Sequence, residues 1–166
     1  WVKTMYGNGQ IKYLVHLKDG KQDGLTTKWD ENGRKKVERN FKDEKWDGLS
    51  VLWYENGQKR DEGHYKDGSA DGLWTFWYEN GQKKEESNFK NGTEDGLGGN
   101  WYENGQIGFV CKMAMGKYIK AKSWKPNGEK CPHTNVVDGN GVLVRYHENG
   151  RKIGEPTSKD GKKAGL

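Results

Sequence analysis

The sequence predicts an all-β protein, an elongated single-layer antiparallel meander of about seven tandem β-hairpin repeats, each 24 residues long. Two observations lead to this prediction. The dipeptide Asn-Gly recurs along the whole chain, at a spacing of 24 residues over its first five copies, and an aromatic residue or Met stands three positions before each Asn. The tripeptide Asp-Gly-Leu recurs between the early copies with the same spacing.

Each Asn-Gly pair lies between two short segments rich in aromatic and β-branched residues, which is the strongest local signal for a β-hairpin. The pairs begin at Asn8, Asn32, Asn56, Asn80, Asn104, Asn127 and Asn149. A type I′ turn needs positive φ at both central residues, which Asn and Gly tolerate. We therefore expect two-residue turns, and these place Trp29 opposite Lys36, Trp53 opposite Arg60 and Trp77 opposite Lys84.

Successive hairpins are joined by segments such as residues 67–70, which suit a four-residue loop. In that register an aromatic side chain faces a glycine of the following strand and covers the gap left by the missing side chain. The expected pairs are Phe41 with Gly48, Tyr65 with Gly72, and Phe89 with Gly96.

The same register predicts one face with a ladder of Trp and cationic side chains, in which Trp53 lies between Lys36 and Arg60. The opposite face carries the Tyr of the Trp-Tyr pairs and the Phe or Tyr at the strand ends. Aromatic and Arg side chains dominate binding hot spots, so these rows are the candidate partner-binding residues. They are Trp29, Trp53, Trp77, Trp101, Arg60, Lys84, Tyr54, Tyr78 and Tyr102.

We interpret the chain as a single array, with regular repeats over 1–106, irregular repeats over 107–137 and the last repeats over 138–166. The irregular stretch gains apolar residues such as Phe109 and Met113, which indicates either a buried junction or a docking site. The first strand starts inside the repeat and the last hairpin opens without closing, so we expect a fragment of a longer array or end-to-end association.

Composition and charge narrow the range of partners that we expect for this chain. Only 31% of the residues are hydrophobic and 32% are charged, yet aromatics reach 12% and recur at fixed intervals, which indicates order. The net charge is +5, but the two signs alternate along every repeat, and nucleic acid is therefore not an expected partner. We find no run of 18 apolar residues, and Trp1–Tyr6 resembles neither a signal peptide nor a transit peptide.

The sequence offers little for catalysis or metal binding, so we expect no enzyme activity, cofactor or metal. The four histidines lie on different repeats, and the spacing of Cys111, Cys131 and His133 matches no zinc motif. A disulfide between Cys111 and Cys131 would need the irregular segment to fold back, because a regular meander places them about 9.6 Å apart. The Asp-Gly pairs suit turns better than calcium sites.

A family resemblance follows from the repeat unit itself. The segment W-Y-E-N-G-Q-K-K-E-E followed by F-K-N-G-T-E-D-G-L, at residues 77–97, resembles the MORN-variant repeat, as do residues 53–73 and 29–49. Through this repeat the chain resembles the YwqK-family antitoxin components of bacterial toxin-antitoxin systems. The resemblance implies protein binding without catalytic residues, and related MORN repeats are associated with membranes and lipids.

The expected function is a non-catalytic protein-binding scaffold, with an antitoxin or immunity role as its most concrete form and a toxin or assembly partner as the bound protein. Two alternatives remain open. One is a cell-surface or carbohydrate-binding module that uses the aromatic rows, and the other is association with anionic lipids through the lysine-rich strands.

Overall fold

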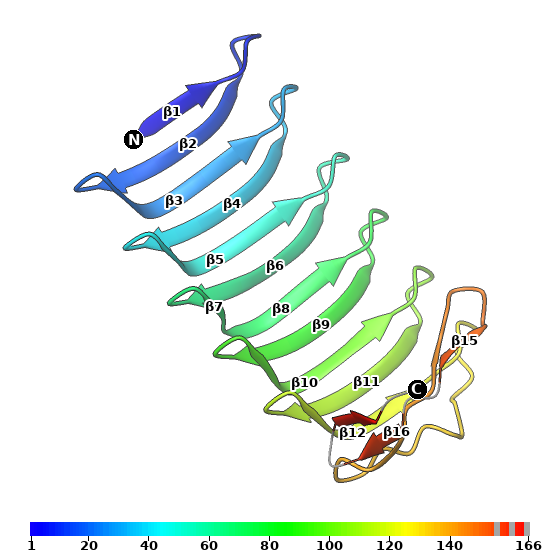
Figure 1. Ribbon diagram of the computed structural model, residues 1–166. Helices are drawn as coiled ribbons and strands as arrows, with labels where there is room; N and C mark the ends of the chain where they lie inside the picture. Colours follow the sequence, from blue (N-terminus) through cyan, green and yellow to red (C-terminus); the bar gives the residue numbers. More distant parts are fainter. Residues whose placement is uncertain (155–156, 160–161, 165–166) are drawn as a thin grey trace. The chain divides into compact units, whose positions relative to one another are not determined.

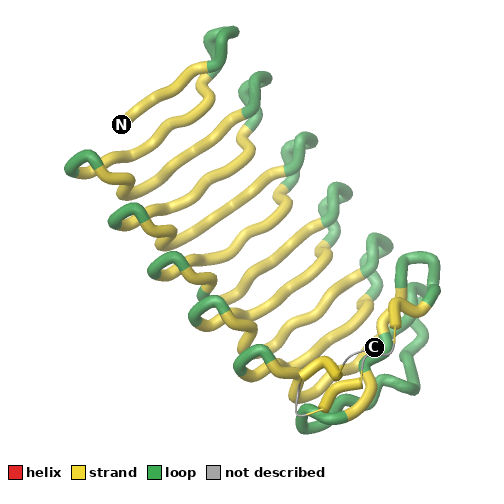
Figure 2. Tube along the Cα trace, viewed as in Figure 1, coloured by secondary structure: helices red, strands yellow, loops and turns green. Residues whose placement is uncertain are grey.

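The computed structural model describes residues 1–154, 157–159 and 162–164, and it describes side chains up to residue 153. All regular structure in these residues is β-strand; short turns join the strands up to β12 (Lys117–Ser123), and a longer irregular segment leads from β12 to β13 (Gly141–Val142) (Figures 1 and 2). The chain divides into two compact units, Trp1–Gly81 and Gln82–Leu166, which are described separately below.

The first unit is an antiparallel meander in which each strand pairs with the next strand along the chain. The short strand β7 pairs with the end of β6, and β8 continues beside β6. The strands are β1 (Val2–Met5), β2 (Ile11–Lys18), β3 (Lys21–Trp29), β4 (Lys35–Lys42), β5 (Lys45–Trp53), β6 (Lys59–Lys66), β7 (Ser69–Ala70) and β8 (Gly72–Trp77).

The second unit continues the hairpin pattern and then changes character. Four regular strands pair in sequence order: β9 (Lys83–Lys90), β10 (Thr93–Trp101), β11 (Ile107–Ala114) and β12 (Lys117–Ser123). Five short strands follow: β13 (Gly141–Val142), β14 (Arg145–Tyr146), β15 (Lys152–Gly154), β16 (Thr157–Lys159) and β17 (Lys162–Ala164). Strand β14 pairs with β15, and β16 pairs with both β13 and β17. The predicted all-β meander of hairpin repeats is confirmed.

The Asn-Gly turns differ from the prediction. In the turn after β5, the Gly57 amide donates to the Tyr54 carbonyl at 3.1 Å, and the Tyr54 amide donates to the backbone carbonyl of Gln58 at 2.9 Å. Only Gly57 has positive φ, and the loop therefore has three residues, 55–57, as in a type I turn followed by a glycine bulge. The Asn56 side chain stabilises this turn instead, because its Oδ1 accepts a hydrogen bond from the Gln58 amide at 3.0 Å.

This extra loop residue moves the predicted register by one position near the turn. Trp53 lies opposite Lys59 instead of Arg60, and Trp29 lies opposite Lys35 instead of Lys36. A bulge then restores the expected pairing, because Leu52 is opposite Asp61 and Arg60 is the additional residue. The sequence prediction was therefore wrong at the turn and right along the rest of each hairpin.

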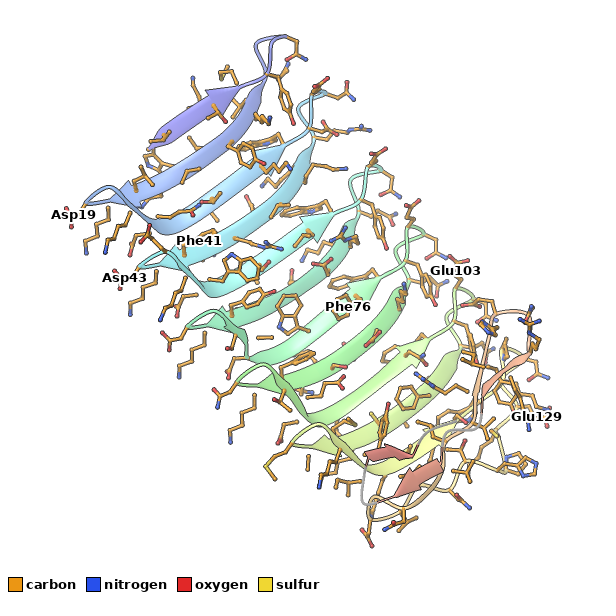
Figure 3. All side chains as sticks on the ribbon, in the orientation of Figure 1. Asp19, Phe41, Asp43, Phe76, Glu103 and Glu129 are labelled. Atoms are coloured by element: carbon orange, nitrogen blue, oxygen red, sulfur yellow. The ribbon has the colours of Figure 1, made fainter. Side chains whose placement is uncertain are left out.

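The two-residue turns lie at the other ends of the strands, where four-residue loops were predicted. Asp67 and Gly68 both have positive φ, at 49° and 87°, and Lys66 pairs directly with Ser69. Asp19 and Gly20 form the same turn, with φ of 51° and 78°. Figure 3 shows Asp19 and Asp43 at the tips of two such turns. Both central positions of a type I′ turn require positive φ, and Asp and Gly meet that requirement here.

The strand-end aromatic residues pair with other residues than the glycines predicted for them. Phe41 is opposite Gly24 and Tyr65 is opposite Gly48, so each aromatic residue pairs with a glycine of the preceding strand instead of the following one. Phe89 was predicted beside Gly96 but pairs with Glu94. The cause is the short turn, because it brings the strand-end aromatic next to the first residues of the following strand and not to its glycine.

Strand alternation separates two faces of the first unit. The aromatic face carries Phe41, Trp46, Tyr65, Trp74 and Phe76, which pair or contact one another. The tryptophan-lysine face carries the Trp that precedes each Asn-Gly turn together with the Lys that opposes it. Figure 3 labels Phe41 and Phe76, which lie over strands β4 and β8.

In the second unit the equivalent of the aromatic face is covered. Phe109, Cys111 and Met113 stand 48 residues after Asp61, Gly63 and Tyr65, and they form a buried cluster with Val136 and Leu143. A second cluster joins Tyr102, Cys131, Val144 and Tyr146. Residues 131–146, which we call the covering segment, therefore pack on the sheet of this unit. Of the two interpretations of the irregular stretch, the buried junction is the one observed.

Candidate functional site

The tyrosines predicted to bind a partner connect neighbouring repeats. The Tyr54 hydroxyl donates to the Trp77 carbonyl at 2.7 Å, and the Tyr102 hydroxyl donates to the Trp124 carbonyl at 2.7 Å. Burial raises the pKa of Tyr54, and it raises the pKa of Tyr102 to about 12. These two hydroxyls are therefore engaged within the protein. Tyr78 is half-buried at the same position of its repeat.

Asparagine side chains reinforce these connections at the turn edge. Asn8 donates to the carbonyl of Glu31, Asn56 to that of Glu79 and Asn104 to that of Pro126, at 2.7 to 2.9 Å. The second repeat departs from this pattern, because Asp30 replaces the Tyr and forms a 2.9 Å ion pair with Arg34. Arg34 then donates to the Glu55 carbonyl at 2.9 Å, which substitutes for the asparagine contact.

The predicted ladder of Trp and cationic side chains exists, with a different set of cations. The Nζ atom of Lys35 lies 5.3 Å from the centre of the Trp53 ring, that of Lys59 lies 5.9 Å from Trp77, and that of Lys83 lies 4.9 Å from Trp101. Arg60 and Lys36, which were predicted on Trp53, instead pair with Asp61 at 2.8 Å and with Glu55 at 3.7 Å. The one-residue shift at the turn explains the exchange.

Each ladder lysine also has a carboxylate partner three residues along its strand. Lys35 pairs with Glu38 at 2.5 Å, Lys83 pairs with Glu86 at 2.6 Å, and Lys59 pairs with Glu62. The cations of this face are thus neutralised within their own repeats. Trp29, Trp53, Trp77 and Trp101 are half-buried, and their role in binding a partner stays a prediction. Lys84, the remaining candidate, lies on β9.

The aromatic face of the first unit holds a continuous cluster of rings. The Trp46 and Tyr65 ring centres are 4.8 Å apart, those of Tyr65 and Trp74 are 5.0 Å apart, and those of Trp74 and Phe76 are 6.1 Å apart. Tilted and edge-on contacts of this kind add to the stability that burial provides. The rings therefore form one packed surface instead of separate side chains.

Glycine makes room for the centre of this cluster. A Cβ atom built on Gly63 would lie 2.1 Å from the Trp74 ring, so the indole rests directly on the Gly63 backbone. The Trp74 Nε1 donates to the His64 carbonyl at 3.1 Å, and only 6% of this residue is exposed. Trp46 at the edge of the cluster is 36% exposed. The accessible aromatic surface is thus the rim of the cluster, with Trp74 as its support.

A cation lies against this rim. The guanidinium of Arg39 is 4.4 Å from the Trp46 ring centre, and its Nε donates to the Ser50 hydroxyl at 3.2 Å. Among the residues that the structure describes, no ion pair is found for Arg39. Lys28 lies on the same face, 5.4 Å from the ring of Tyr13. The Asp61 carboxylate, by contrast, is occupied by Arg60.

The covering segment of the second unit brings a cation to carboxylates of the sheet. Arg145 lies 6.0 Å from the Phe109 ring and lines a cavity of about 90 Å³ together with Glu85 and Glu94. Burial raises the pKa of Glu85, and the nearby Glu94 carboxylate adds to that rise. The Glu94 carboxylate also accepts the Ser87 hydroxyl at 3.0 Å. The carboxylates of Glu85 and Glu94 therefore belong to the sheet, and the guanidinium of Arg145 belongs to the covering segment.

The two cysteines stay separate. Both are free and buried, Cys111 in the cluster around Phe109 and Cys131 in the cluster around Tyr146, so the disulfide considered from the sequence is not formed. Burial raises the pKa of the Cys111 thiol to about 12. The Cys131 sulfur lies 3.3 Å from the Tyr146 hydroxyl, which donates to it.

No group of three or more His, Cys, Asp or Glu side chains could hold a metal ion within residues 1–154. No helix in the described part of the chain is long and apolar enough to cross a membrane.

The arginine and the rings that line the aromatic face were missed by sequence reasoning. Arg39, Trp46, Trp74 and Phe76 were not among the candidates, because the candidate rows were taken from the Trp and Tyr that repeat every 24 residues. Trp46 and Trp74 do not repeat in that way. The available signal was strand alternation, since the aromatic residues of Gly72–Trp77 at positions 74 and 76 must point to the same face.

Comparison with known families finds three segments that match the MORN repeat variant, at residues 22–43, 46–67 and 70–91. MORN repeats are generally protein-binding or lipid-binding repeats. The matched segments confirm the predicted resemblance at the level of the repeat. No curated protein matches the sequence.

Two solved structures match this chain at low sequence identity. A mutant of S. aureus TarM in complex with Fondaparinux, alpha-GlcNAc-glycerol and UDP matches with 10% identity over 66% of this chain, at a TM-score of 0.38. A second TarM structure matches with 10% identity over 66% of this chain, at a TM-score of 0.37. The chain spans 21% of the length of each of these proteins.

Proposed function

We propose that this protein is a non-catalytic scaffold that binds another protein on the aromatic face of its first unit. The observation that supports the proposal is the cluster of Trp46, Tyr65, Trp74 and Phe76, which keeps an accessible rim beside the guanidinium of Arg39. Trp, Tyr and Arg are the residue types that supply most of the free energy of protein interfaces. Residues with an accessible ring on a rigid support lose little conformational entropy on binding.

The tryptophan-lysine face is a weaker candidate, because its charges are already paired within the repeat. A partner that approached Trp53 would have to compete with the contacts that Lys35 makes to this ring and to Glu38. Arg39 offers a guanidinium with no carboxylate partner among the described residues. A partner carboxylate would gain an ion pair there without breaking one.

Carbohydrate binding is less well supported by the geometry. A sugar ring stacks on the open face of an aromatic ring, whereas Trp74 is almost fully buried between Gly63 and the neighbouring rings. The cluster presents ring edges and a cation, which suit the side chains of a protein partner better. Association with anionic lipid would rest on the lysines, and three of these are paired with glutamates.

Toxin neutralisation is the most concrete form of this proposal. It rests on the resemblance of the repeats to those of antitoxin components and on the absence of any need for catalysis in such a role. An antitoxin of this kind would cover a functional surface of the toxin with the aromatic face, and an assembly scaffold would use the same surface for a structural partner.

The test is a pull-down from lysate of the source organism with three forms of the protein. The Trp46→Ala, Tyr65→Ala variant removes the rim of the aromatic face, and the Trp53→Ala, Trp77→Ala variant removes two rings of the opposite face as a matched control. We expect a protein that is retained by the wild type and the control but lost with the first variant. Retention only on cell-wall glycan or on anionic liposomes would overturn the proposal, provided that circular dichroism shows all forms folded.

A further inference from the structure

The covering segment of the second unit shows how a repeat of this chain accommodates a second layer. Residues 131–146 carry aliphatic side chains onto the sheet, where Val136 and Leu143 pack with Phe109, Cys111 and Met113. Only a few of these residues are in regular strands, at β13 and β14. The segment folds back on itself, because the Asn135 amide donates to the Val142 carbonyl at 2.9 Å and Val137 pairs with Asn140, and both arms supply an aliphatic side chain to the sheet.

Charge is matched across that layer. The sheet supplies Glu85 and Glu94 to the cavity beneath the segment, and the segment supplies Arg145 to the same cavity. A buried carboxylate without a nearby cation would be strongly disfavoured, and the arginine offsets that cost. The covering segment thus carries the charge opposite to that of the sheet below it.

The equivalent face of the first unit carries the reverse charge. Glu94 corresponds by the repeat to Trp46, two repeats earlier, and Ser87 corresponds to Arg39. Asp61 corresponds to Glu85, but its carboxylate is already paired with Arg60. The charged groups of this face that lack a carboxylate partner in the described structure are Arg39 and Lys28, both of which lie against aromatic rings.

We infer that the partner binds the aromatic face of the first unit through a segment that carries aliphatic side chains and at least one carboxylate. The aliphatic side chains pack on the rim formed by Trp46, Tyr65 and Phe76. The carboxylate pairs with the Arg39 guanidinium, which Ser50 and Trp46 hold in place. This inference rests on the proposed function and specifies the chemistry of the partner.

The contact of Arg39 with the Trp46 ring is expected to strengthen this ion pair. An arginine held against an indole ring loses less side-chain freedom on binding than a free arginine does, and the guanidinium has further N–H groups besides the Nε–H that donates to Ser50. A carboxylate can then accept from these N–H groups. Hydrogen bonds between a guanidinium and a carboxylate are stronger than bonds between neutral groups, so this position should contribute much of the specificity.

The experiment is a selection of random 12-residue peptides displayed on phage against the full chain, with the Trp46→Ala variant used to remove peptides that bind elsewhere. We expect the enriched peptides to combine aliphatic residues with Asp or Glu. Their affinity, measured by fluorescence anisotropy, should fall by roughly tenfold or more for the Arg39→Glu variant.

A charge exchange separates a specific contact from a loss of folding. Peptides in which the acidic residue is changed to Lys should bind the Arg39→Glu variant better than they bind the wild type. The Lys45→Glu variant changes the net charge by the same amount at the exposed first position of β5, and it should leave the affinity within about twofold. Enrichment of peptides without acidic residues, or no response to Arg39→Glu, would overturn the inference.

The outcomes also distinguish this inference from the proposed function. A partner protein that is lost with the Trp46→Ala, Tyr65→Ala variant but is unaffected by Arg39→Glu would keep the scaffold proposal and refute the acidic segment. A partner that depends on Trp53 and Trp77 would refute the choice of face, and with it the inference, while protein binding itself would stand.

Discussion

The aromatic face of the first unit and its equivalent in the second unit are built on the same hairpin repeat. The two faces differ in what buries their apolar side chains. In the second unit, Phe109 and Met113 are buried by residues 131–146 of the same chain. In the first unit, the rings pack sideways on one another and on Gly63, and Trp46 stays partly exposed. One repeat scaffold can therefore support either an internal second layer or an open surface, depending on a few side chains.

The largest expected effect comes from disrupting the second layer. Val144 is 0% exposed in the covering segment, and the Val144→Asp change would bury a carboxylate among Tyr102, Cys131 and Tyr146. We expect the second unit to lose about 4 kcal/mol or more of stability. Hydrogen exchange should show lost protection in β11 and β12 and retained protection in β3 to β5. The Val137→Asp variant is the control, because that residue is 57% exposed; equal effects at both positions would contradict the layered packing.

A smaller loss is expected where the first unit packs sideways. The Gly63→Ala change places a methyl group where the Trp74 ring lies, and it should destabilise the protein by about 1–3 kcal/mol. Urea unfolding followed by Trp fluorescence measures this change. The Gly7→Ala variant is the control, because nothing lies within 4 Å of its added Cβ. Combining Gly63→Ala with Trp74→Ala should cost less than the sum of the two single changes; strict additivity would argue against the contact.

The connections between repeats give the next prediction. The Tyr54→Phe change removes the hydroxyl that donates to the Trp77 carbonyl and should cost about 1 kcal/mol. Tyr13→Phe is a suitable control, because the contact recorded for Tyr13 is with Lys28 through its ring. Thermal unfolding of both variants provides the comparison. If Tyr13→Phe destabilised the protein as much as Tyr54→Phe, the hydroxyl contact would not be the cause.

The smallest effect is expected on the tryptophan-lysine face. Lys35→Met removes one exposed cation from the Trp53 ring and from Glu38, and we expect a loss of about 0.5 kcal/mol that shrinks at high salt. A double-mutant cycle of Lys35→Met with Trp53→Leu isolates the contact with the ring. A coupling energy near zero would show that the ladder is a geometric coincidence and would leave Trp53 free for other contacts.

Sequence periodicity predicted the repeat, the all-β class and the antiparallel order of the strands, because those depend on spacing and on hairpin signals that recur many times. It assigned the two kinds of turn the wrong way round. Asn56 was expected to adopt positive φ, but its side chain accepts the Gln58 amide and only Gly57 adopts that conformation. The choice between a two-residue and a three-residue loop depends on such local hydrogen bonds, which spacing alone does not reveal.

The candidate site was predicted less well than the fold. The Trp and Lys ladder was expected and exists, although Lys35 takes the place of Lys36 beside Trp53 because the turn is one residue longer. The aromatic face was expected only in part: the strand-end residues Phe41 and Tyr65 were placed opposite the Trp ladder, but Trp46 and Trp74 were missed because they do not recur with the repeat. The covering segment could not be predicted from the sequence, because its contacts join Phe109 to Val136 and Leu143 without any sequence period.

The contacts at the turn edge have a consequence for how such a protein can change in length. Tyr6 and Tyr54 each reach a carbonyl 23 positions ahead, and Asn8 and Asn56 do the same. Removing or duplicating one whole repeat joins equivalent points, so each tyrosine and asparagine again finds its acceptor. Unequal recombination between gene segments that encode neighbouring repeats would therefore yield folded products, and natural variation in the number of regular repeats should occur in whole units.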